Sequence, residues 1–199
     1  MDLKELLYDR MAEEPVSIGS RLIAEPIMDD TYFSRAVCLI VDKPSSGGHV
    51  GLILNKPVDY NLSDLFPYTG DVGKNIPIYC GGPVDLERMT LLHTLGDELG
   101  TSFEVLPGLY VGGEVDKVVE YLKSGKESEG KLRFFLGYSG WEEGQLAREI
   151  SQKSWAVLND FTSPVQLKGE GVSFWRNEIK KLGDDYRSWL MIPTNPSFN

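Results

Sequence analysis

The stretch Leu132-Arg-Phe-Phe-Leu-Gly-Tyr-Ser-Gly-Trp141 says more about the fold than any other part of the chain. Its first half, residues 132–136, is a short apolar run of the kind that forms a buried strand. The second half, residues 137–141, contains two glycines, and glycine permits turns that other residues resist. A helix is expected over the following residues, 142–152. The stretch therefore predicts a strand, a tight turn anchored by a buried Trp141, and a helix.

Short apolar runs bounded by Pro, Asp, Gly or Ser predict further buried strands on both sides of this stretch. These predicted strands span residues 17–24, 33–41, 50–54, 76–80, 89–95, 103–106 and 109–111. Apolar spacing and stop signals predict helices over residues 3–11, 115–122 and 172–182, and one helical turn over residues 62–66. Because these helices do not alternate regularly with strands, the order predicts an α+β domain rather than a doubly wound parallel sheet.

The composition is that of one soluble globular domain, with 41% hydrophobic and 25% charged residues in a chain of 199. We predict a main domain over residues 16–192, a helical extension over residues 1–15 and a loose tail over residues 193–199. Acidic residues outnumber basic ones by 30 to 20, which gives a formal net charge of -10. That charge repels phosphate backbones and disfavours general nucleic-acid binding.

The sequence predicts a cytoplasmic protein that does not enter membranes. The first residues lack the apolar stretch of an export signal, and the longest apolar runs are far shorter than the roughly 20 residues that cross a bilayer. Cys38 and Cys80 lie in apolar, strand-like contexts, where free buried thiols are expected in a cytosolic protein. A disulfide between them stays open as the alternative.

No cofactor or metal is predicted. The two histidines, His49 and His93, together with Cys38 and Cys80 supply four ligand types, but no pair has the short spacing of a structural zinc site. The chain also lacks the GK[ST] signature of a nucleotide-binding loop, so a triphosphate ligand is not expected.

A catalytic alternative uses Ser139 or Cys80 as the nucleophile and His93 as its base, in a hydrolase or transferase. Ser139 follows a predicted strand and precedes a predicted helix, as in a nucleophile elbow. That motif requires glycine two residues after the serine, where this chain has Trp141. The structural interpretation of the turn is therefore preferred.

A DNA-binding alternative depends on basic residues of two predicted helices. Arg176, Lys180 and Lys181 lie on one helix, and Lys117 and Lys123 lie on the other. Acidic residues are interspersed on both helices, so a solvated face of mixed charge is the simpler interpretation.

Several segments together resemble the AlgH/YqgE family, in matching order and spacing from about residue 19 to residue 190. The segments are Gly19-Ser-Arg-Leu-Ile-Ala-Glu-Pro-Ile-Met-Asp29, Phe33-Ser-Arg-Ala-Val37, Gly51-Leu-Ile-Leu-Asn-Lys-Pro57, Gly81-Gly-Pro-Val84, Leu136-Gly-Tyr-Ser-Gly-Trp141 and Gly144-Gln-Leu146. The resemblance implies a single α+β domain of the bacterial cytosol, with a strongly bent, mostly antiparallel or mixed, partly barrel-like sheet flanked by helices. Members are often labelled transcriptional regulators, but the resemblance carries over no catalytic residues.

We therefore expect a non-enzymatic regulatory or ligand-binding protein that acts through an unidentified protein or small-molecule partner. Three glycine-rich segments, residues 55–57, 81–83 and 137–145, are expected to converge into one groove with exposed backbone donors, because glycines near strand and helix ends leave N–H groups accessible. The expected groove residues are Asn55, Pro57, Gly81, Gly82, Pro83, Gly137, Tyr138, Ser139, Gly140, Trp141 and Gln145.

Overall fold

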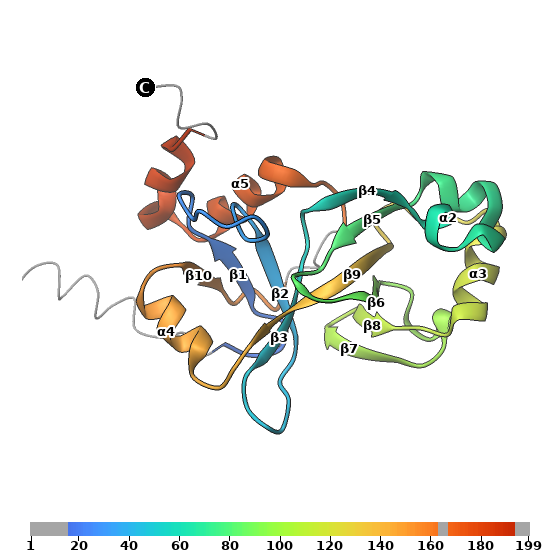
Figure 1. Ribbon diagram of the computed structural model, residues 1–199, viewed down its shortest axis with the longest axis horizontal. Helices are drawn as coiled ribbons and strands as arrows, with labels where there is room; N and C mark the ends of the chain where they lie inside the picture. Colours follow the sequence, from blue (N-terminus) through green and yellow to red (C-terminus); the bar gives the residue numbers. More distant parts are fainter. Residues whose placement is uncertain (1–15, 163–166, 194–199) are drawn as a thin grey trace, which may run out of the picture.

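Strand β9 (Leu132–Trp141) is the centre of the fold in the computed structural model, which describes residues 16–162 and 167–193 (Figure 1). One edge of β9 pairs antiparallel with β6 (Val84–His93). The other edge serves two neighbours in succession: β5 (Pro77–Cys80) pairs parallel with residues 134–136, and β3 (His49–Ile53) pairs antiparallel with residues 139–141. The long strand therefore joins two branches of the sheet.

The predicted tight turn at residues 137–141 is wrong, because these residues continue β9. Gly137 has a positive φ of 68°, which only glycine adopts readily. It lies opposite an irregularity in β6, where four residues fall between the paired positions Val84 and Met89 while β9 places only Gly137 between their partners. The glycine permits a bulge within a strand rather than a reversal of the chain.

The ten strands form one curled sheet, a mostly antiparallel half-barrel that confirms the expected α+β class. The strand order is β10-β1-β2-β3-β9-β6-β8-β7, and β4 and β5 branch from β9. The remaining strands are β1 (Arg21–Ala24), β2 (Val37–Asp42), β4 (Pro57–Asn61), β7 (Ser102–Leu106), β8 (Leu109–Gly112) and β10 (Trp155–Leu158). Strands β7 and β8 form the predicted hairpin.

Helices cover both ends of the sheet (Figure 1). At one end, α5 lies over β1 and β2, η3 packs against α5, and α4 lies beside β10; at the other end, α2, η1 and α3 pack together. The helices are α2 (Leu62–Leu65), α3 (Val115–Lys123), α4 (Gln145–Ser151) and α5 (Gly171–Lys181), with 3-10 segments η1 (Pro67–Asn75), η2 (Gly96–Leu99) and η3 (Asp184–Met191).

Strands β1 and β2 are buried on both faces. Their sequences are therefore continuous apolar runs and do not alternate between apolar and polar residues. Ile23 and Leu39 point to the cluster that contains Trp175 of α5. Their neighbours Leu22 and Cys38 point to a second cluster, which contains residues of β9, α4 and β10. The sheet is therefore the middle layer of three at this end of the molecule.

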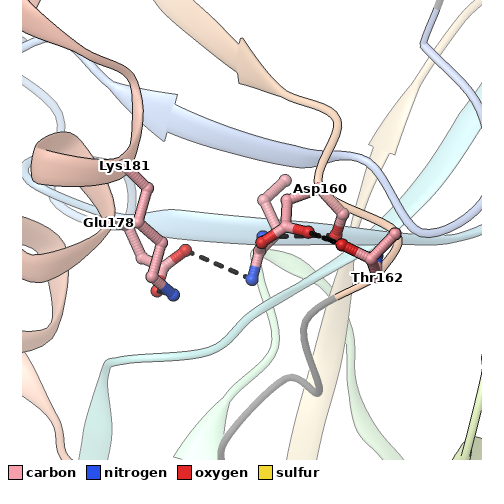
Figure 2. Close-up of polar contacts among 5 residues, drawn as sticks. Asp160, Thr162, Glu178 and Lys181 are labelled. Carbon is pink, nitrogen blue, oxygen red and sulfur yellow. Dashed lines mark hydrogen bonds and ion pairs between the residues drawn. The ribbon is translucent and has the colours of Figure 1, made fainter.

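A buried charged cluster anchors α5 to this part of the sheet (Figure 2). The Arg21 side chain on β1 is only 1% exposed, and its guanidinium lies 3.4 Å from carboxylate oxygens of both Glu178 and Asp160. Glu178 also accepts a bond of 2.6 Å from Lys181, and Asp160 accepts bonds from Thr162. Glu178 and Lys181 come from α5, whereas Asp160 follows β10, so the cluster connects three elements.

The sequence patterns missed β4 and β10 and placed most other elements to within a few residues. Both missed strands are short, and β4 is polar and largely exposed. The predicted helix at residues 3–11 and nearly all of the predicted tail lie outside the described residues. Cys38 and Cys80 are free thiols.

Candidate functional site

The three glycine-rich segments meet where β3, β5 and β9 join. The amide of Gly81 donates to the carbonyl of Leu136 (2.7 Å), and the Gly81 carbonyl accepts from Ile53 (3.0 Å). A Cβ atom at Gly81 would collide with the Gly137 carbonyl, and one at Gly82 would collide with Ser139 Oγ and the backbone of Tyr138. Glycine is therefore required at both positions because backbone packs directly on backbone.

Other residues of the expected groove have different surroundings. Tyr138 is half-buried beneath the guanidinium of Arg88, which lies 5.6 Å from the ring centre. Trp141 is buried, and its indole N–H donates to Glu149 (2.8 Å). Gln145 donates to the same carboxylate (2.8 Å) and accepts from the amide of residue 142. Residues 139–141 are occupied in strand pairing and do not open a helix. A ligand groove at these residues stays a prediction.

The residues of the catalytic alternative are not brought together. His93 pairs with Leu132 at one end of β9, and Ser139 lies seven positions further along, which is roughly 20 Å in an extended strand. Cys80 pairs with Leu136, which lies four positions along β9 from Leu132, the partner of His93. The two pairs are therefore about 13 Å apart along the strand. Ser139 Oγ donates to the Gly81 carbonyl (3.0 Å) within the core. Burial raises the pKa of Cys80 and lowers the pKa of His93.

Replacing Ser139 with alanine is expected to lower the free energy of unfolding by only about 1 kcal/mol, the net value of one buried hydrogen bond whose acceptor keeps a second donor. Chemical denaturation measures the change. If Ser139 were a nucleophile, the alanine variant would lose all catalytic turnover and keep the free energy of unfolding of the wild type. That pattern would contradict a structural role for Ser139.

Asn55, from the first of the three segments, is the central residue of a second site. Its side chain is fully buried. Oδ1 accepts from the amide of Val37 (2.9 Å), and Nδ2 donates to the carbonyls of Arg35 (3.0 Å) and Gly171 (2.8 Å). The amide of Gly171 also donates to the Asn55 carbonyl (2.7 Å). One side chain therefore connects the end of β3, the start of β2 and the start of α5.

Three cationic side chains, Arg35, Lys56 and Arg176, surround this connection, and we call them the cationic junction. Arg35 has a positive φ of 52°, an unusual conformation for a residue other than glycine. Its guanidinium lies 4.8 Å from the ring centre of Trp175. Lys56 donates to the carbonyl of Ser34 (2.5 Å), and Arg176 donates to the carbonyl of residue 190 (2.9 Å).

The cations of the junction have backbone carbonyls as their partners. Arg35 Nη2 donates to the carbonyls of Ile192 (3.3 Å) and Pro193 (2.6 Å), whereas the buried Nη1 has no acceptor among the described residues. Within the same residues, no carboxylate forms an ion pair with Arg35, Lys56 or Arg176. The junction therefore concentrates positive charge that forms no ion pair among the described residues of an acidic protein.

The electrostatics of the junction agree with this geometry. Burial lowers the pKa of Arg35, and the charge of Arg176 lowers it further. Burial also lowers the pKa of Lys56; Arg35 adds to that effect, while Cys80 and Asp30 oppose it. The charge of Arg35 is therefore repelled by those of Arg176 and Lys56, and a bound anion would relieve that repulsion.

A surface hollow of about 270 Å³ lies near the junction, but its arginine is already occupied. Arg133 donates to the carbonyls of Leu54, Leu167 and Gly169 and lies 4.0 Å from the ring centre of Tyr79. The hollow is also lined by acids and bases together, so its chemistry favours no ligand class.

Sequence reasoning named Asn55 and Pro57 as groove residues but missed Arg35 and Lys56. Both missed residues lie inside segments that carry the family resemblance, which was the signal available. Arg176 was judged only as part of a mixed-charge helix face. Among residues 16–162 and 167–193, no group of three or more His, Cys, Asp or Glu side chains is placed to hold a metal ion. In the same part of the chain, each helix is too short or too polar to span a bilayer.

The curled, mostly antiparallel half-barrel with helices at both ends is an α+β fold. The chain belongs to the AlgH-like family, whose model matches residues 21–187. A UPF0301 protein of Parabacteroides distasonis is 38% identical over 182 residues, which cover 91% of this chain and 90% of the relative. UPF0301 protein BF2109 of Bacteroides fragilis is 39% identical over 189 residues, with 92% and 91% coverage.

Two solved structures share the fold. The solution structure of the AlgH protein from Pseudomonas aeruginosa matches with a TM-score of 0.68 and 26% identity, covering 92% of this chain and 97% of that one. Protein DIP2367 from Corynebacterium diphtheriae matches with a TM-score of 0.72 and 22% identity, covering 92% and 96%. None of these names states an activity.

Proposed function

We propose that this chain is a non-enzymatic binding domain of the cytoplasm, which acts through a small molecule or protein bound at the cationic junction. The observation that carries the proposal is the buried Nη1 of Arg35, which has no acceptor among the described residues. A buried donor without a partner costs roughly 1–3 kcal/mol, more when it is charged, so a ligand that supplies the acceptor gains binding energy there. Regulation, the label often given to the family, would then be indirect.

The hydrolase or transferase alternative has less support. Its three residues, Ser139, Cys80 and His93, lie on separate parts of the sheet, and Ser139 Oγ is used in a core hydrogen bond. A general base must reach its nucleophile within hydrogen-bond distance, directly or through one water.

Direct DNA binding also has less support, and we expect no shift of a DNA fragment even at low salt. On the two basic helices, Lys117 pairs with Glu114 and Lys181 pairs with Glu178, while Arg176 donates to a backbone carbonyl. A gel-shift assay at several salt concentrations measures this directly. Binding that weakens steeply as salt is added, the signature of counterion release, would contradict the expectation.

Capture from native bacterial cytosol tests the binding function. The immobilised full chain is compared with Lys56→Met, which removes one junction charge from a half-buried site, and with Lys123→Met, which removes an exposed charge on α3. Retained proteins and metabolites are identified by mass spectrometry. We expect one molecule retained by the wild type and Lys123→Met but depleted by Lys56→Met. Equal retention by all three chains would overturn the proposal.

A further inference from the structure

We propose that the cationic junction binds a small oxyanion, a carboxylate or phosphate group, in place of the backbone carbonyls that Arg35 now contacts. This inference rests on the proposed binding function and names the chemical class of its ligand. It is carried by the position of hydrogen-bond donors and acceptors around the Arg35 guanidinium.

The carbonyl oxygens of Ile192 and Pro193 mark where an anion's oxygen would lie. Both accept from Arg35 Nη2, at 3.3 and 2.6 Å, and together they supply only partial negative charge. Arginine recognises carboxylates and phosphates most strongly when two parallel N–H groups donate to two oxygens. Here Nη2 donates only to neutral carbonyl groups, and Nη1 has no acceptor among the described residues.

The surroundings hold the guanidinium ready for such a ligand. Trp175, fully buried and fixed by its own 2.8 Å bond to the Ala24 carbonyl, lies beneath Arg35. Asn55 holds the Arg35 backbone by its carbonyl. An arginine whose backbone is held and whose guanidinium packs near a buried ring loses less freedom when an anion binds, and preorganisation of this kind increases affinity.

The balance of charge favours an anion over a neutral ligand. Arg35 lies within electrostatic range of both Arg176 and Lys56, and the pKa of Lys56 is lowered in part by Arg35. The carboxylate of Asp30 opposes the lowering of the Lys56 pKa. That carboxylate already accepts hydrogen bonds from the amides of residues 32 and 33. One bound oxyanion would neutralise part of this positive charge, which the described carboxylates leave unpaired.

For an oxyanion to replace the two carbonyls, residues 192–193 must move away from Arg35. This segment follows the 3-10 segment η3, and Pro193 is exposed to solvent. We expect the oxyanion to take both Nη1 and Nη2, so binding and release of the two carbonyls occur together.

Titration of the full-length chain with inorganic phosphate and, separately, with acetate tests the inference, with chloride at equal ionic strength as the reference. The arginine side-chain and Ile192 amide signals are followed by ¹H–¹⁵N NMR. The wild type is expected to show saturable shifts of both signals with one midpoint, beyond those caused by chloride. The phosphate and acetate arms identify which oxyanion is preferred.

Variants locate the site. Arg35→Met is expected to weaken binding at least about tenfold, the loss of one charge-assisted contact. Because Arg35 is buried, Lys56→Met and Arg176→Gln serve as milder variants and should each weaken binding several-fold. Arg148→Gln, an exposed arginine on α4, should bind as the wild type does.

Two results would overturn the inference: no saturable shift beyond chloride in the wild type, or equal binding by the junction variants and Arg148→Gln. If the oxyanions fail to bind while capture from cytosol still depends on Lys56, the ligand class is wrong but the binding function stands. If capture also shows no dependence on Lys56, both proposals fail.

Discussion

Replacing Asn55 with alanine is expected to lower the free energy of unfolding by about 4 kcal/mol, since each buried group left without a partner costs roughly 1–3 kcal/mol. Two backbone groups, the Val37 amide and the Arg35 carbonyl, lose their partner, while the Gly171 carbonyl keeps only the intrahelical bond of α5. The side chain is fully buried, so water does not replace it without a rearrangement. Urea denaturation followed by circular dichroism measures the change.

The matched control is Asn177→Ala on the exposed face of α5, where the Asn177 side chain accepts a long bond of 3.4 Å from Lys180. Surface substitutions of this kind change stability by less than about 0.5 kcal/mol. A loss for Asn55→Ala as small as that of Asn177→Ala would show that Asn55 does not hold β2, β3 and α5 together.

Substitution of Glu178 by methionine is expected to cost about 3 kcal/mol, because removing one of the two carboxylates that face a buried arginine leaves its charge only partly compensated. Arg21 would remain 1% exposed, with Asp160 at 3.4 Å as its carboxylate partner. Arg21→Met should be similarly costly. The double variant should lose less than the sum of the two single losses, by about 1–3 kcal/mol, because it leaves neither buried charge alone. A double-mutant cycle from thermal or urea unfolding gives this coupling energy.

The exposed pair of Arg187 and Asp184 provides the control cycle, at a comparable distance of 2.9 Å but with side chains 77% and 82% exposed. Exposed pairs contribute roughly 0–1 kcal/mol, so its coupling should be small. Equal coupling in the two cycles would mean that burial adds nothing to the Arg21 cluster and that the cluster does not fix α5 on the sheet.

The parts of the fold that the sequence predicts correctly are those with local signals. The β7–β8 hairpin follows from Pro107-Gly108 between two apolar runs, and α3 and α5 follow from their apolar spacing. At Gly137 the local signal was correctly recognised as a special backbone conformation but wrongly assigned to a turn. A positive φ serves a turn or a bulge equally well, and the neighbouring strand β6 decides which one forms.

The site was less predictable, since its contacts join residues that are far apart in the chain. The acceptors of Arg35 lie 157 and 158 residues away, and Asn55 bonds Gly171 across 116 residues. Both side-chain donors of Asn55 and its Oδ1 atom are used in bonds within the protein, and its expected contact with a ligand stays a prediction. No local pattern indicates which cations lack a carboxylate partner, because that depends on how α5 and η3 pack against the sheet.

The most direct test of a non-enzymatic binding role is the thermal unfolding of the chain in a small-molecule extract of bacterial cytosol, with the extract analysed by mass spectrometry before and after incubation. A ligand that binds the folded state raises the midpoint of unfolding. We expect the wild type and Lys123→Met to be stabilised by the extract, Lys56→Met to be stabilised much less, and the composition of the extract to stay unchanged. Consumption of a metabolite by the wild type, or equal stabilisation of all three chains, would contradict it.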